Sequence, residues 1–87
     1  MAQQFNSQNI KKRQSVLVFL KSSSTPVVMY VENPEELYTE LQQAMKNPVA
    51  TIIEREMQGA LKKISFVSTQ IASIAIQEEQ YVPNQNR

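Results

Sequence analysis

The stretch NPEELYTELQQAMKNP, residues 33–48, contains the start, the apolar face and the end of a short helix. Asn33 suits the N-cap, because its side-chain oxygen can accept a hydrogen bond from a free first-turn amide. Pro34 falls at the first helical position, where its missing N–H costs nothing. Pro48 disfavours helical dihedral angles at the residue before it. The pattern therefore predicts a helix between the two Asn-Pro pairs.

This predicted helix is amphipathic. Its acidic first turn, with Glu36, and its basic last turn, with Lys46, both complement the helix dipole. Apolar residues recur at helical spacing and form one stripe along the helix, which has to be buried. The stripe consists of Leu37, Leu41, Ala44 and Met45. We expect this stripe to pack on a sheet.

Five segments around the helix have strand patterns. They are rich in β-branched and aromatic residues or alternate in polarity, and turn residues separate them; they span 15–21, 27–31, 49–57, 61–67 and 71–77. Short links favour an antiparallel meander of the last three. The sequence thus predicts an α+β fold in the order β-β-α-β-β-β. One helix packs on a small, mostly antiparallel sheet of about five strands. Phe19 and Phe66 lie in strongly apolar strands, so interior rings are expected for both.

Three regions are expected along the chain. Residues 15–77 form a single α+β domain, residues 1–14 a flexible polar N-terminal tail, and residues 78–87 a flexible polar C-terminal tail. Neither tail carries enough apolar surface to offset the entropy of ordering its backbone.

Composition excludes most enzymatic chemistry. The 87 residues contain no histidine, no cysteine and one glycine, which removes the usual general base, thiol nucleophiles and glycine-rich phosphate loops. We therefore expect no enzyme, no catalytic residue, no metal site and no cofactor. No apolar run approaches the roughly 20 residues that span a bilayer, and no signal peptide is recognisable. The expected location is the cytoplasm, without membrane attachment.

A protein partner, or a second copy of the chain in a homodimer, is the expected ligand. An open sheet has edges that need covering, and so small a domain gains stability by associating. The exposed flank of the helix is the candidate partner surface, with Glu36, Tyr38, Glu40 and Gln43. A third hypothesis is a weak binding site for a small ligand in the crevice between helix and sheet.

Binding of RNA or DNA is the alternative function. A basic segment precedes the first strand, and further lysines follow it; the candidate contacts are Lys11, Lys12, Arg13, Lys21 and Lys63. The formal net charge of the whole chain is only +1, which does not favour polyanions.

Two stretches also match a family pattern: LKSSSTPVVMYVENPEELYTELQQAMKNP and KKISFVSTQIASIAI. The matching positions comprise a Thr-Pro turn, an acidic-start helix, a Lys-Lys pair and a final strand. They are Thr25, Pro26, Glu36, Leu37, Tyr38, Glu40, Leu41, Ala44, Met45, Lys62, Lys63, Ser68 and Ile71. On these residues, residues 16–77 of the chain resemble a group of small uncharacterised cyanobacterial and plastid proteins. The Gln/Asn-rich start and the segment TIIEREM depart from that pattern. The resemblance implies the same order of elements and a cytoplasmic or stromal setting, and it implies no activity.

Overall fold

The structure is a computed structural model that describes residues 10–82. The predicted helix is present as α2 (Pro34–Lys46), capped at its start by Asn33, whose side-chain oxygen accepts from the Glu36 amide. That bond measures 3.2 Å. Asn47 is extended and ends the helix, as the following proline requires.

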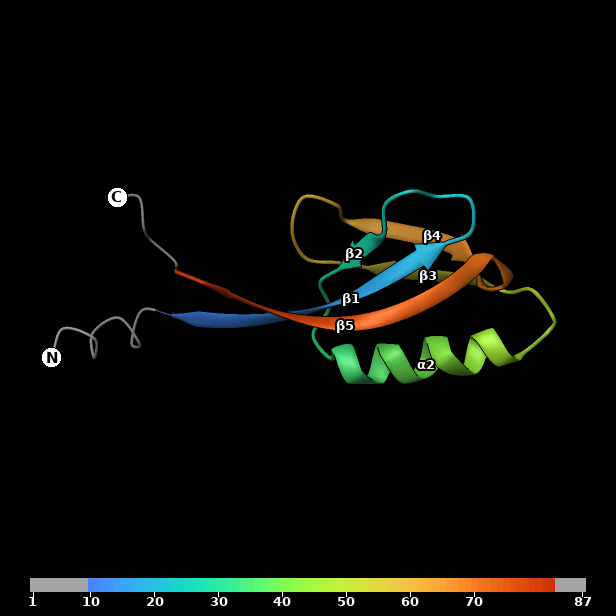
Figure 1. Ribbon diagram of the computed structural model, residues 1–87, viewed down its shortest axis with the longest axis horizontal. Helices are drawn as coiled ribbons and strands as arrows, with labels where there is room; N and C mark the ends of the chain where they lie inside the picture. The colour runs from blue at the N-terminus through green and yellow to red at the C-terminus, as the bar shows by residue number, and fades with distance from the viewer. Residues whose placement is uncertain (1–9, 83–87) are drawn as a thin grey trace, which may run out of the picture.

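Within the described residues, five strands accompany α2 in the predicted order β-β-α-β-β-β, which confirms the α+β fold class. They are β1 (Lys11–Leu20), β2 (Val27–Met29), β3 (Ile52–Glu56), β4 (Lys63–Val67) and β5 (Ile71–Tyr81), with a 3₁₀ turn, η1 (Ser68–Gln70), before β5. The strands make two antiparallel sheets, one ordered β2-β1-β5 and the other β3-β4 (Figure 1).

The expected meander of the last three strands is wrong. β5 pairs with β1 instead of β4. The turn η1 carries the chain away from β4, and the Lys21 amide donates to the Gln70 carbonyl at 2.8 Å, so β5 starts beside the end of β1. Apolar pairing favours this register, because Val16 faces Ile76 and Val18 faces Ile74.

The core draws on both sheets and on α2. Its buried residues are Val16, Val18, Met29, Leu37, Leu41, Ile53, Met57, Phe66 and Ile71. Leu37 and Leu41 are buried as predicted, and Ala44 packs against the cluster. Met45 is 37% exposed, contrary to expectation. It lies eight residues after Leu37, which rotates it about 80° around the helix axis.

The two phenylalanines differ. Phe66 is buried opposite Ile53, so its interior position is confirmed. Phe19 is 36% exposed, because alternation along β1 places Val18 in the core and its neighbour on the opposite face of the sheet.

The boundaries expected at residues 15 and 77 fall inside β1 and β5. Lys11–Gln14 and Glu78–Tyr81, assigned to flexible tails by sequence, pair with each other as an antiparallel two-stranded ribbon. The remaining tail residues, 1–9 and 83–87, lie outside the described part of the chain. The ribbon forms because each polar segment supplies the other with backbone partners and opposite charges. Arg13 faces Glu79, and Lys12 lies 3.8 Å from Glu78.

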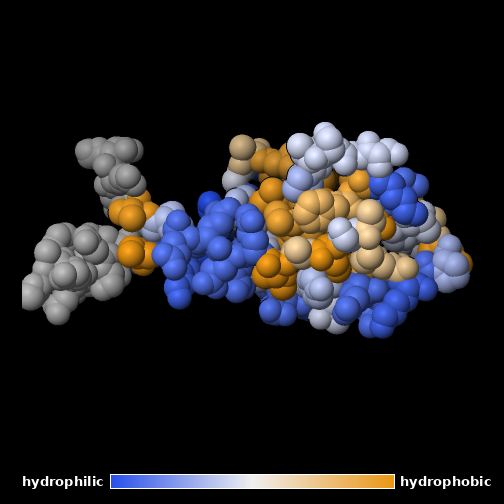
Figure 2. Space-filling view, in the orientation of Figure 1, coloured by the Kyte–Doolittle hydropathy of each residue, from blue (hydrophilic) through white to orange (hydrophobic). Residues whose placement is uncertain are grey.

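The ribbon projects from the body (Figure 1), and hydrophilic side chains cover it in Figure 2. The molecule measures 56 × 23 × 22 Å, with a radius of gyration of 16.1 Å. A compact chain of this length has a radius of gyration of roughly 12 Å. No helix in residues 10–82 is long and apolar enough to cross a membrane.

Candidate interaction surface

An open groove of about 560 Å³ lies between α2, the end of β3 and the segment that joins β2 to α2. Its lining includes apolar residues that also belong to the core or pack on it, namely Val31, Leu37 and Met57. Charged side chains complete the lining, namely Glu32, Glu36, Glu40, Arg55 and Glu56. Four carboxylates and one guanidinium leave a net charge of −3. We call this feature the acidic groove.

Local structure explains why these side chains meet. Glu36 and Glu40 are four residues apart on α2 and so lie on one helix face. The Gln58 amide donates to the Tyr30 carbonyl at 3.2 Å, which holds the segment after β3 beside the end of β2. Arg55 pairs with Glu40 and ties β3 to the helix.

The predicted partner surface is only partly brought together. Glu36 and Glu40 line the acidic groove, whereas Tyr38 is half-buried, Gln43 is exposed, and neither contributes to its lining. The helix pattern could not reveal the contributions of other elements. Glu32 lies just before the helix cap, and Arg55 and Glu56 come from β3.

The five predicted nucleic-acid contacts do not gather into one patch. Lys12 and Arg13 pair with Glu78 and Glu79, and Lys63 lies 3.6 Å from Glu54. Lys11 begins β1 and Lys21 directly follows its last residue, so about 33 Å separates them at the rise of a strand.

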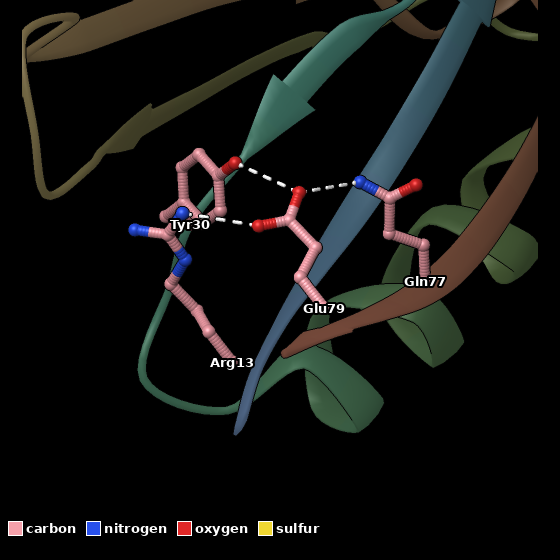
Figure 3. A network of polar contacts seen from close by, with 4 residues as sticks. All are labelled: Arg13, Tyr30, Gln77 and Glu79. Carbon is pink, nitrogen blue, oxygen red and sulfur yellow. Dashed lines mark hydrogen bonds and ion pairs between the residues drawn. The ribbon is translucent and has the colours of Figure 1, made fainter. Parts of the chain in front are cut away.

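A polar cluster holds the base of the ribbon to the body, and sequence reasoning missed it. Figure 3 shows the Glu79 carboxylate between three donors. Arg13 Nη2 donates at 3.0 Å, Gln77 Nε2 at 2.9 Å and Tyr30 Oη at 3.3 Å. The carbon at the centre of the Arg13 guanidinium lies 4.3 Å from the Tyr30 ring centre and 5.1 Å from that of Tyr81. The hydrogen bond to Glu79 raises the pKa of Arg13 above its ordinary value.

Tyr30 connects this cluster to the acidic groove, since it lines both the groove and a second cavity of about 370 Å³ beside Arg13. Among residues 10–82, no group of three or more His, Cys, Asp or Glu side chains is arranged to hold a metal ion. The groove and the cluster together offer fixed negative charge next to apolar and aromatic surface, which is suited to binding cations.

No family model, no curated protein and no solved structure matches this chain. The resemblance to the cyanobacterial and plastid group therefore stays a prediction.

Proposed function

We propose that this protein is a non-catalytic protein-interaction module whose acidic groove binds a basic segment of a protein partner. The supporting observation is the groove itself, which brings four carboxylates beside the apolar side chains of Val31, Leu37 and Met57. One of the four, Glu40, pairs with Arg55. The stems of Lys and Arg can lie on apolar surface while their charged heads reach carboxylates. The groove volume also falls in the usual range for ligand sites, about 300–1,000 Å³.

Two double variants test this proposal. Each removes one negative charge from α2 and one from β3, so the two variants have the same net charge. Glu36→Gln with Glu56→Gln neutralises two groove carboxylates, whereas Glu35→Gln with Glu54→Gln neutralises their neighbours outside the groove. The probe is a fluorescein-labelled peptide of alternating serine and arginine with four arginines, titrated by anisotropy at low and moderate salt.

The groove variant should bind the peptide about fivefold or more weakly, because each exposed charge pair contributes up to about 1 kcal/mol. The control variant should bind like the unaltered chain. Equal losses in both variants would indicate attraction to overall charge and refute a groove-specific site. If a free arginine analogue binds as tightly as the peptide, the result would favour the hypothesis that the same groove binds a small ligand.

Self-association is a second proposal, and the edge of the three-stranded sheet favours it. β5 has 11 residues, and in the described structure only β1 pairs with it. A long free edge is a template for another strand, so a homodimer could form there. Sedimentation velocity over a hundredfold concentration range should then show a dimer. A monomer at every concentration would exclude this arrangement.

RNA or DNA binding is the weaker alternative, because Lys12, Arg13 and Lys63 already lie beside carboxylates. If the chain causes no mobility shift of labelled RNA or DNA at low salt, this alternative is wrong. We retain the cytoplasm as the proposed location, on the sequence argument alone.

A further inference from the structure

The guanidinium of Arg13 sits among groups that suit a bound arginine. Tyr30 and Tyr81 present aromatic rings to it, and Glu79 accepts a hydrogen bond from it. We call Tyr30, Tyr81 and Glu79 the cation cage. Aromatic faces attract cations through the ring quadrupole, and the planar guanidinium also stacks on them. The same three groups would serve equally well for an arginine from another chain.

The carboxylate of the cage does not depend on Arg13 for its position. Tyr30 Oη and Gln77 Nε2 both donate to Glu79 Oε2, while Arg13 bonds the other oxygen, Oε1 (Figure 3). Two donors therefore continue to orient the carboxylate when Arg13 leaves. The Arg13 side chain is 48% exposed and ends a flexible stem, so it can swing into solvent.

The cage also lies where an incoming basic segment would pass. Tyr30 lines the acidic groove as well as the cavity that contains Arg13. A segment whose cations contact Glu36 and Glu56 would thus have its next side chains close to Tyr30.

We propose that the cation cage binds an arginine side chain of the partner, and that Arg13 fills the cage as an internal competitor in the free protein. This inference rests on the proposed function and specifies its ligand. Arg13 then weakens partner binding, because the incoming arginine has to displace it. Removal of Arg13 should strengthen binding although it makes the chain more negative by only one charge.

The test compares Arg13→Gln with Lys21→Gln, which loses the same charge just beyond the other end of β1. Both are titrated with the serine-arginine peptide described above. Arg13→Gln should bind about tenfold more tightly than the unaltered chain, and Lys21→Gln should differ from it by less than about twofold, since distant exposed charges are screened. Adding Glu79→Gln to Arg13→Gln should abolish the gain.

The outcomes separate this inference from the proposed function. If the unaltered chain binds the peptide but Arg13→Gln binds no better than Lys21→Gln, the competitor role is wrong and the groove proposal stands. If no variant binds the peptide, both are wrong. A gain that survives Glu79→Gln would show that the cage carboxylate is not involved.

A second measurement uses the unaltered chain and so does not depend on the variants folding. The chain has three tyrosines, and Tyr38 lines neither the cage nor the groove. Ring resonances of Tyr30 and Tyr81 should move as the peptide is added, while those of Tyr38 stay in place. Movement of Tyr38 alone, or of none of the three, would overturn the inference.

Discussion

Replacing Leu41 with alanine should cost about 3 kcal/mol of unfolding free energy. Leu41 is fully buried between α2 and the sheets, and Leu→Ala changes at such sites cost roughly 2–5 kcal/mol through lost transfer energy and the remaining cavity. A domain of 87 residues has a total stability of roughly 4–13 kcal/mol. The variant should therefore keep roughly 1–10 kcal/mol of unfolding free energy and unfold at a clearly lower urea concentration.

Met45→Ala is the matched control. It lies one turn later on α2, belongs to the same apolar stripe in the sequence, and is 37% exposed. This variant should lose less than about 1 kcal/mol of unfolding free energy, as for most surface substitutions. Urea unfolding followed by circular dichroism at 222 nm measures both. Equal costs for the two variants would refute the inference that Leu41, and not Met45, anchors the helix.

Substitutions at three further positions test local features by the same unfolding assay. Ser15 Oγ is buried without a hydrogen-bond partner, so Ser15→Ala should leave stability unchanged or raise it by up to about 1 kcal/mol; a loss above that would reveal a missed partner. Asn33→Ala should cost about 1 kcal/mol because the cap bond to Glu36 is lost, and Asn33→Ser should restore most of it. Gly59 has a φ of +102° with no atom within 4 Å of an added Cβ, so Gly59→Ala should cost about 1 kcal/mol through backbone strain alone. A stabilised alanine variant would contradict that conformation.

The helix was predictable because its signals are local. The cap at Asn33, the proline at 34 and the apolar stripe all lie within 16 residues of sequence, and each acts on its own neighbours. Met45 was wrongly expected to be buried. The sequence pattern does not determine how wide the buried stripe of the helix is, because that width depends on the surface packed against α2.

The ribbon was not predictable in the same way, since neither of its strands is stable alone. Arg13 and Glu79 are 66 residues apart, and each segment read singly looks like a solvated tail. The division into two sheets has a similar origin. The short turn between β4 and β5 resembles a hairpin link, but the apolar residues of β5 match those of β1.

The sequence alone predicted only part of the acidic groove. Glu36 and Glu40 could be placed on one helix face from their spacing. Glu32 joins them from the segment just before the helix cap. Arg55 and Glu56 join only because the Gln58 amide bonds the Tyr30 carbonyl and brings the end of β3 to the start of the helix. Such a contact between distant backbone groups leaves no periodic pattern.

The most direct test of the proposed function is a map of backbone amide shifts in the ¹⁵N-labelled chain as the serine-arginine peptide is added. We predict that the shifts concentrate around Glu32, Glu36 and Glu56, where the acidic groove lies, and that added salt reduces them. Shifts confined to β4 and to the β3 residues that do not line the groove, or no shifts at millimolar peptide, would contradict the account.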